Sequence, residues 1–201
     1  MKNNTYRLIG LTGPTGSGKT LVSKAFESAG FAVVDADTIA HKALADKECI
    51  SELSAAFGDD ILFSDGSVNR KALAQKAFSD TDSTKKLNRI THPVILRLSL
   101  EAFEGLNKNG YKDIVFDAPT LFESGSDKLC DKIVVVTAPV DVRLERILSR
   151  DNITQEQAIS RINAQHEDDF YTKRADFVIV NDKDTQKLSH SAEKVIKELL
   201  L

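Results

Sequence analysis

The chain has 201 residues, of which 41% are hydrophobic and 28% are charged, a composition typical of a globular domain with a buried core. Its 27 Lys and Arg against 30 Asp and Glu give a net charge of −3, which excludes the global positive field of a nucleic-acid or anionic-membrane protein. It shows no apolar run near the roughly 18 residues of a membrane span, no secretory leader, and no metal-ligand spacing around Cys49 and Cys130. We expect a cytoplasmic protein.

The first predicted elements flank a glycine-rich segment. Residues 6–11 are apolar enough for a buried strand, and apolar positions within 21–29 predict a helix. The segment between them is Gly13-Pro14-Thr15-Gly16-Ser17-Gly18-Lys19-Thr20, which fits the phosphate-binding pattern G-x-x-x-x-G-K-[ST]. Its glycines would let backbone N–H groups approach phosphate oxygens at a helix N-terminus. Lys19, with its charge matched only by phosphate, would reach the β- and γ-phosphates, and the Thr20 hydroxyl would bind Mg²⁺. The segment predicts a nucleoside-triphosphate site.

The second predicted strand, residues 31–35, carries two aspartates at its end. Asp35 and Asp37 lie where a strand ends and a helix from Thr38 begins. Carboxylates at this position lie on the edge where open α/β sheets bind ligands. Aspartate is also a favoured helix N-cap, and capping accounts for one of the two. The other is free to point into a cleft, and we assign a functional role to Asp37.

Residues 43–109 show an almost wholly helical pattern without a strand. This block is longer than a minimal strand–helix–strand crossover requires, so we interpret it as a substrate-binding insertion. Helical padding on the sheet remains the alternative. His92-Pro93 lies inside its last helix, where proline removes a backbone N–H and usually bends the helix. The chemistry of a single histidine does not decide the role of His92.

Three further apolar strands are predicted at residues 113–117, 132–136 and 177–181. The first ends in Asp117, the form of a Walker B element, whose aspartate supports the Mg²⁺ shell. Continuous β-branched runs separated by helices are typical of a parallel sheet buried on both faces. A final amphipathic helix is predicted from residue 182 to the end of the sequence.

A charged helical segment separates the fourth and fifth strands. Arg143, Arg146 and Arg150 recur at spacings of three and four, which places them along one helix face. Thr154, with Gln157 three residues later, predicts a fresh helix start. A mobile cationic flap over a triphosphate would have this pattern. A solvated helix face would show the same pattern, so both interpretations stay open.

Taken together, these blocks resemble the dephospho-CoA kinase family over residues 9–181. The phosphate loop is shared by many families, whereas the D-A-D, His-Pro and P-x-L-F-E blocks in that order are more specific. The residues that carry the resemblance are Gly10-Leu11-Thr12-Gly13, Gly16 to Thr20, Val34 to His41, Arg70, Leu73, Phe78, Leu87, Ile90, His92-Pro93, Ile95, Asp117-Ala118-Pro119, Leu121-Phe122-Glu123, Arg143, Arg146, Arg150, Gln165, Ala175-Asp176, Val178-Ile179 and Asn181.

The sequence departs from the family pattern at four places. Pro14-Thr15 stands within a stretch that usually has two glycines and an isoleucine, Thr120 replaces leucine, and Asn69 replaces a frequent aspartate. Asp182-Lys183 replaces a glycine-containing turn. None of these changes removes a reactive group, so they concern only the shapes of the phosphate loop and of the loop near the adenine.

The resemblance implies a fold class and a domain organisation. It implies an α/β P-loop NTPase fold, with a five-stranded parallel sheet, helices on both faces, a helical acceptor-binding insertion and a helical lid. The core would comprise residues 1–42, 110–142 and 174–201, the acceptor subdomain residues 43–109, and the lid residues 143–173. The implied enzyme is a monomer or weak homo-oligomer that transfers the ATP γ-phosphate to the ribose 3′-hydroxyl of dephospho-CoA.

The resemblance also implies roles for individual residues. Asp37, Lys19 and Arg146 would be catalytic, with Asp37 as the base for the 3′-hydroxyl. The ATP site would comprise Gly13, Pro14, Thr15, Gly16, Ser17, Gly18, Lys19, Thr20, Arg146, Arg150 and Asn181. The acceptor site would comprise Thr12, Asp37, Arg70, His92, Asp117 and Glu123. Thr20 and Asp117 would bind Mg²⁺, partly through water.

Two other functions share features of this pattern. A nucleoside or nucleoside-monophosphate kinase would share the core and the lid, but its small acceptor needs less helical surface than residues 43–109 provide. A regulatory GTP switch would need a guanine-reading N-K-x-D motif. The run Asn181-Asp182-Lys183-Asp184 has those residue types in another order and does not match.

Overall fold

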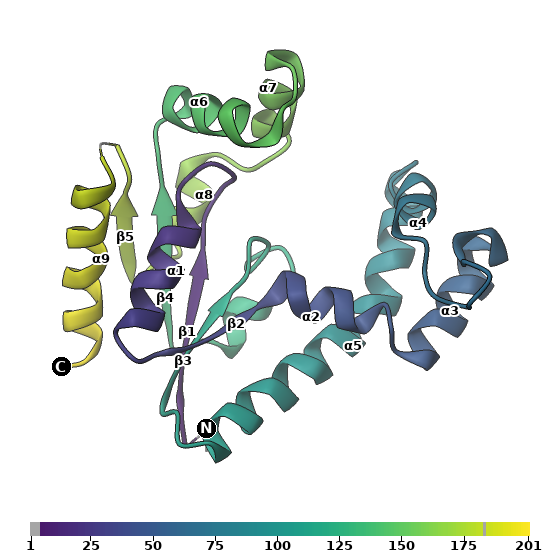
Figure 1. Cartoon of the computed structure of the whole chain (residues 1–201), viewed down its shortest axis with the longest axis horizontal. Coiled ribbons are helices and arrows are strands. Elements are labelled where there is room, and N and C mark those ends of the chain that lie inside the picture. Colours follow the sequence, from purple (N-terminus) through teal and green to yellow (C-terminus); the bar gives the residue numbers. More distant parts are fainter. Residues whose placement is uncertain (1–4, 183) are drawn as a thin grey trace. The chain divides into compact units, whose positions relative to one another are not determined.

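The computed structural model describes residues 5–182 and 184–201 (Figure 1). Its strands are β1 (Arg7–Thr12), β2 (Ala32–Asp35), β3 (Asp113–Asp117), β4 (Lys132–Thr137) and β5 (Phe177–Val180). Its α-helices are α1 (Lys19–Ser28), α2 (Ala36–Ala43), α3 (Lys47–Phe57), α4 (Arg70–Ala77), α5 (Thr81–Lys108), α6 (Val140–Asp151), α7 (Gln155–Asn163), α8 (Asp168–Thr172) and α9 (Thr185–Leu199). Short 3₁₀ helices span Asp59–Ile61 and Ser126–Leu129.

The strands form one five-stranded parallel sheet in the order β2-β3-β1-β4-β5. Leu11 of β1 is in register with Asp117 of β3 and with Val134 of β4. The carboxyl ends of the central strands therefore meet at one edge of the sheet, where the glycine-rich segment leaves β1. The predicted sheet and its five strands are confirmed.

The two faces of the sheet are covered differently (Figure 1). Helices α1 and α9 pack together on one face, through a buried apolar cluster that includes Val22, Phe26, Leu188, Val195 and Ile196. On the other face, a methyl group added to Gly10 would meet Leu121 and Cys130, so the segment after β3 lies directly against the sheet. Helix α8 lies near this segment through the ring contact between Tyr171 and Phe122.

The chain divides into two compact units, one comprising residues up to Val34 with Leu106–Leu201, the other Asp35–Gly105. The second unit has its own core, which includes Leu53, Ile61 and Leu73. Cys49 lies in this core, and burial raises the pKa of its thiol to about 11. Asp46 caps α3 and forms an ion pair with Arg97 of α5, with 2.6 Å between carboxylate and guanidinium. Helix α5 runs without a break through Pro93.

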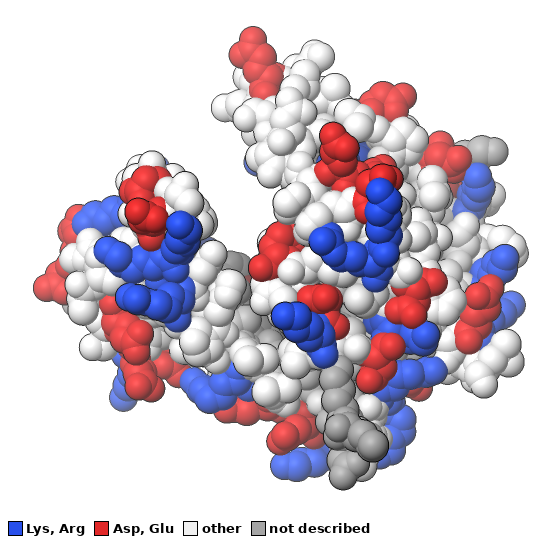
Figure 2. Space-filling model, turned by 180° about the vertical axis from the view of Figure 1, so that it is seen from behind, with Lys and Arg blue, Asp and Glu red and all other residues white. Residues whose placement is uncertain are grey.

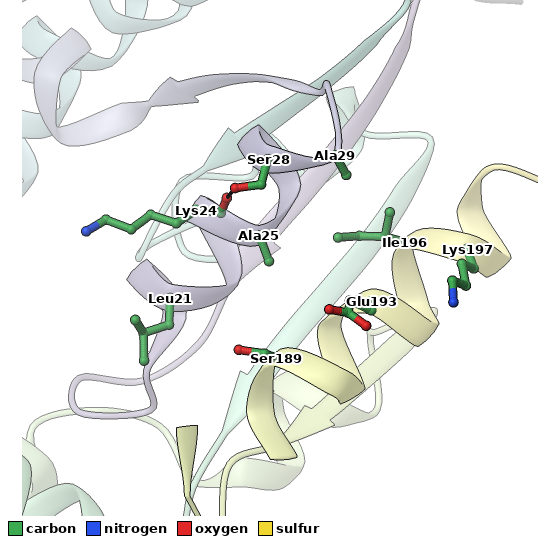
Figure 3. A pocket seen from close by; sticks show the side chains of 9 residues that line it. All are labelled: Leu21, Lys24, Ala25, Ser28, Ala29, Ser189, Glu193, Ile196 and Lys197. Carbon is green, nitrogen blue, oxygen red and sulfur yellow. Dashed lines mark hydrogen bonds between the residues drawn. The ribbon is translucent and has the colours of Figure 1, made fainter. Parts of the chain in front are cut away.

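The surface mixes charges of both signs. On the face drawn in Figure 2, Lys and Arg are interspersed with Asp and Glu. Among the helices of the described residues, none has the length and apolar character needed to cross a membrane. A surface groove of about 530 Å³ lies between α1 and α9 (Figure 3). Its lining comprises Leu21, Lys24, Ala25, Ser28, Ala29, Ser189, Glu193, Ile196 and Lys197, which are not residues of the predicted site.

Candidate active site

The glycine-rich segment between β1 and α1 forms a tight turn followed by a helix start. The carbonyl of Pro14 accepts a hydrogen bond from the N–H of Ser17, 3.2 Å away. Gly16 is the third residue of this turn and has φ +78°, the positive value that a type II turn requires there. A side chain at this position would be strained, and its Cβ would lie 2.9 Å from the backbone oxygen of Arg143. The turn therefore needs glycine at position 16.

The carbonyl oxygens of three consecutive residues in this loop point into the protein. Each accepts a hydrogen bond from a side chain distant in sequence. The pairs are Thr15 O with Arg143 Nε at 2.9 Å, Gly16 O with Arg146 at 3.3 Å, and Ser17 O with Asn181 Nδ2 at 2.7 Å. The loop is thus anchored through its acceptors.

Several hydrogen-bond donors of the loop, unlike these carbonyls, have no partner among the described residues. Within residues 5–182 and 184–201, the N–H groups of Gly16, Gly18 and Lys19 have no hydrogen-bond acceptor. The hydroxyl of Ser17 is buried without a partner among the same residues. Successive free N–H groups at a helix N-terminus form an anion-binding site, because the helix dipole adds to their partial positive charge. This arrangement suits a phosphate group.

Arg146 and Asn181 form a connected pair beside the loop. The Arg146 guanidinium donates to Asn181 Oδ1 at 3.1 Å and to the Asn181 carbonyl at 3.4 Å. A Cβ on Gly18 would lie 2.2 Å from Asn181 Nδ2, so the loop and Asn181 are in close contact. Two residues assigned to ATP from the sequence thus lie together against the phosphate loop, and Asn181 fixes the orientation of Arg146.

Arg143 differs from the expectation of a cationic face directed at phosphates. Its side chain is only 3% exposed, and its Nη2 donates to Gln165 Oε1 at 3.0 Å. The same oxygen accepts the N–H of Thr15 at 2.9 Å. Burial lowers the pKa of the Arg143 guanidinium, and the Asp168 carboxylate at 3.9 Å opposes this shift. Sequence reasoning missed this role of Arg143 and Gln165, whose only signal was their place in the family pattern.

Arg150 is placed differently again. It forms a two-pronged ion pair with the adjacent Asp151, at 2.6 and 2.9 Å, and its side chain is 61% exposed. Seven residues separate Arg143 from Arg150, which is about 10 Å along a helix. The loop contacts of α6 therefore involve Arg143 and Arg146, and Arg150 lies near its C-terminal end.

Lys19 and Asp117 meet at the carboxyl edge of the sheet. They form an ion pair, with side chains 17% and 12% exposed respectively. The expectation that only phosphate matches the Lys19 charge is wrong, because β3 runs beside β1 and brings Asp117 to the same edge. On β1, the hydroxyl of Thr12 is buried and donates to the Pro119 carbonyl at 3.2 Å.

The oxygen donors here fit a magnesium ion that arrives with a nucleotide. Among the described residues, no group of three or more His, Cys, Asp or Glu could hold a metal ion. Mg²⁺ needs no such cage, since it is usually bound by one or two carboxylates together with water and substrate phosphates. Asp117 supplies a carboxylate, and Thr20, at the start of α1, supplies an exposed hydroxyl.

In the second unit, the two aspartates at the end of β2 and the start of α2 have different environments. Asp35 is the N-cap of α2, and its carboxylate accepts the N–H groups of Asp37 at 2.7 Å and Thr38 at 3.2 Å. Asp37 lies in the first turn of α2 and is exposed. Since Asp35 makes both capping bonds, the carboxylate of Asp37 is not needed to cap the helix.

Two further predicted acceptor residues lie in this unit. Arg70, at the start of α4, is 2.6 Å from Nε2 of His41. Because a guanidinium only donates, Nε2 of His41 must accept this hydrogen bond. His92 is exposed on α5. Asp37, Arg70 and His92 thus belong to one unit, whereas all the other predicted site residues belong to the other unit.

Glu123 lies beside an aromatic cluster in the unit that contains the sheet. Its carboxylate is 4.0 Å from Nε2 of His166, and the His166 ring stacks on Phe170 with centroids 3.7 Å apart. The Arg174 guanidinium lies 4.0 Å from the centroid of the same phenylalanine. Sequence reasoning did not find this cluster. His166, Phe170 and Arg174 recur at spacings of four, but only the tertiary structure brings Glu123 beside them.

Comparison with known proteins finds a matching family model, similar sequences and similar solved structures. The dephospho-CoA kinase family model matches residues 7–187. A dephospho-CoA kinase from Listeria monocytogenes is 41% identical over 182 residues, which covers 90% of this chain and 91% of the relative. A crystal structure from Thermus thermophilus matches with a TM-score of 0.85 and 31% identity over 98% of both chains. A dephospho-CoA kinase structure from Campylobacter jejuni matches with a TM-score of 0.72 and 30% identity over 96% of both chains.

Proposed function

This chain belongs to the dephospho-CoA kinase family, and we propose that it uses Mg-ATP to phosphorylate the ribose 3′-hydroxyl of dephospho-CoA. The observation that most supports this proposal is the phosphate loop. Its carbonyls are anchored by Arg143, Arg146 and Asn181, and the N–H groups of Gly16, Gly18 and Lys19 remain free for phosphate among the described residues. A loop fixed in this way needs no reorganisation when charge develops on the transferring group.

The sheet-containing unit would bind ATP. Lys19 lies beside Asp117 at the carboxyl edge of the sheet, where a γ-phosphate would compete for its charge. Arg146, oriented by Asn181 and Gly16, would stabilise the negative charge on the transferring phosphoryl group. A bound Mg²⁺ would supply charge neutralisation between the phosphates, held by Thr20 and Asp117 partly through water. Arg150 and Asn181 would lie further along the nucleotide.

The second unit would contribute the proton acceptor and much of the acceptor site. The ribose 3′-oxygen forms a bond to the γ-phosphorus while the bond from that phosphorus to the β–γ bridging oxygen breaks, which releases ADP. The proton of the 3′-hydroxyl passes to the carboxylate of Asp37, which is exposed and free of capping bonds. The acceptor residues that we propose in this unit are Arg70 and His92, and those that we propose in the sheet-containing unit are Thr12, Asp117 and Glu123.

A division of labour along the chain follows from this assignment. Residues 1–42, 110–142 and 174–201 would form the nucleotide-binding core, residues 43–109 the acceptor subdomain and residues 143–173 the lid. We propose a cytoplasmic enzyme that works as a monomer or weak homo-oligomer. ATP and dephospho-CoA are the partners that its chemistry requires.

Turnover of a panel of acceptors tests the proposal. Purified protein with Mg-ATP should phosphorylate dephospho-CoA far faster than adenosine, AMP, CMP or UMP, and ³¹P NMR should place the new phosphate on the ribose 3′-oxygen. Faster turnover of a nucleoside or nucleoside monophosphate would contradict the proposal. Omission of Mg²⁺ is the control, and it should abolish turnover if the metal accompanies ATP.

A further inference from the structure

The backbone of Thr15 is held at both of its polar groups by two side chains. Its N–H donates to Gln165 Oε1 at 2.9 Å, and its carbonyl accepts Arg143 Nε at 2.9 Å. The Arg143 Nη2 donates to the same Gln165 oxygen at 3.0 Å. These three hydrogen bonds close a ring, and they use both lone pairs of the Gln165 carbonyl oxygen.

The two side chains come from one packed body. Arg143 lies on α6, and Gln165 follows the C-cap of α7. Ile147 of α6 and Ile162 of α7 belong to one buried apolar cluster, so the two helices are packed together. The ring therefore connects the phosphate loop to the α6–α7 pair.

The ring also acts on the part of the loop that determines its shape. Thr15 and Gly16 are the central residues of the turn closed by the hydrogen bond from Ser17 to Pro14. Rotation of the Thr15–Gly16 peptide would convert this turn to another type and redirect neighbouring N–H groups. A hydrogen bond to the Thr15 carbonyl opposes that rotation directly.

We propose that Arg143 and Gln165 are positioning residues, which hold the Thr15 peptide so that the N–H groups of the phosphate loop point toward ATP. This inference rests on the proposed function, and it assigns a task to two residues that do not themselves touch the reacting atoms. Its specific consequence concerns ATP, because neither side chain belongs to the predicted acceptor site.

A purely stabilising role would have other consequences. Buried hydrogen bonds anywhere in the sheet-containing unit would lower the melting temperature when removed and would weaken all activities together. A positioning role predicts weaker ATP binding in a protein that remains folded. It also predicts that removing either partner has nearly the same effect as removing both, because both act on one peptide.

The test measures the ATP dissociation constant by calorimetry in the absence of any acceptor. Gln165→Met keeps the side-chain length and removes the accepting oxygen, so it should weaken ATP binding about tenfold. Gln165→Glu keeps an accepting oxygen and should stay within about threefold of wild type. Arg143→Met should also lose about tenfold, and the double variant should lose far less than a hundredfold. Gln155→Met, at an exposed position on α7, is the matched control and should bind ATP as wild type does.

The melting temperature and the KM for dephospho-CoA complete the experiment. In folded Gln165→Met, the acceptor KM should change less than twofold. An ATP dissociation constant within twofold of wild type in both folded single variants would overturn the inference. Equal weakening of ATP and acceptor binding would also overturn it. A chain that fails to phosphorylate dephospho-CoA would contradict the proposed function. The positioning role of Arg143 and Gln165 would still be tested, because ATP binding is measured without acceptor.

Discussion

The phosphate loop and the acceptor residues of the second unit are held in place in different ways. Three consecutive carbonyls of the loop bind side chains from distant segments, and one of those side chains, Arg143, is almost fully buried. In the second unit, Asp37 and His92 are exposed, and Arg70 contacts the likewise exposed His41. The conformation of the loop therefore depends on long-range contacts. The acceptor residues of the second unit are exposed, and the fold of that unit does not depend on their side chains.

This difference predicts where a substitution should act. A change near the loop alters the geometry of the ATP site even when the changed residue does not touch ATP. A change at an exposed acceptor residue removes only its own contact, because surface substitutions usually cost little stability.

Lys19→Ala should lower kcat by more than about 10³-fold, since a cationic group that would contact the transferring phosphates is lost. The partly buried Asp117 also loses its ion-pair partner. Steady-state kinetics with Mg-ATP provide the measurement, and Lys24→Ala, an exposed change on the same helix, is the control. A folded variant that retains wild-type kcat would refute the assignment of the phosphate site.

Arg146→Ala should lower kcat/KM by roughly 10³-fold, because a transition-state arginine contributes far more than a surface ion pair. Arg161→Ala, which removes an exposed arginine from α7, should have little effect. If Arg146→Ala loses less than about tenfold, the guanidinium serves only to anchor Gly16 and Asn181. Single-turnover rates would separate that structural role from a role in the chemical step.

Asp37→Asn should lower kcat by about 10²-fold or more while ATP binds normally, since the variant keeps the shape and loses the proton acceptor. Asp35→Asn provides the comparison, because asparagine still accepts the capping hydrogen bonds of α2. Activity of Asp35→Asn should stay within about threefold of wild type. Near-normal turnover of Asp37→Asn would mean that its carboxylate is not the base.

The smallest expected effect concerns acid stability of the second unit. Asp80 accepts the Ser83 N–H and hydroxyl and the Ser79 hydroxyl, and the backbone bond from Ser83 contributes most to lowering its pKa to about 2. A depressed folded-state pKa stabilises the protein above the unfolded value near 3.9, and this contribution is lost as the pH falls toward 2. Asp80→Ala should therefore lower the melting temperature by about 1–2 °C at pH 7, because surface substitutions usually cost little stability. The difference from wild type should shrink toward pH 2, and a constant difference would contradict the assigned pKa.

The sheet could be predicted from the sequence because each strand is a continuous apolar run and because the loop pattern fixes the first strand–helix pair. The Thr154 capping box on α7 was also predictable, since it depends on residues three apart. The role of Arg143 could not be predicted. Spacing places Arg143, Arg146 and Arg150 on one helix face, but only the tertiary structure shows that α6 contacts the loop at Arg143.

The ion-pair partner of Lys19 and the identity of the capping aspartate could not be predicted either. The Lys19–Asp117 pair depends on the pairing of β1 with β3, two segments about a hundred residues apart, so no local pattern predicts it. That one of the two aspartates caps a helix could be expected from its position. Which one does so depends on backbone dihedral angles, and Asp35 has the extended conformation of an N-cap.

One pair of measurements tests the contrast between the two regions most directly. The ATP dissociation constant and the KM for dephospho-CoA should be determined in Asn181→Ala and in Arg70→Met. Asn181→Ala removes the anchor of the Ser17 carbonyl and the support of Arg146, so it should weaken ATP binding about tenfold and leave the acceptor KM within twofold. Arg70→Met should raise the acceptor KM and leave ATP binding unchanged. If both variants weaken both substrates equally, the two regions are not independent and the account is wrong.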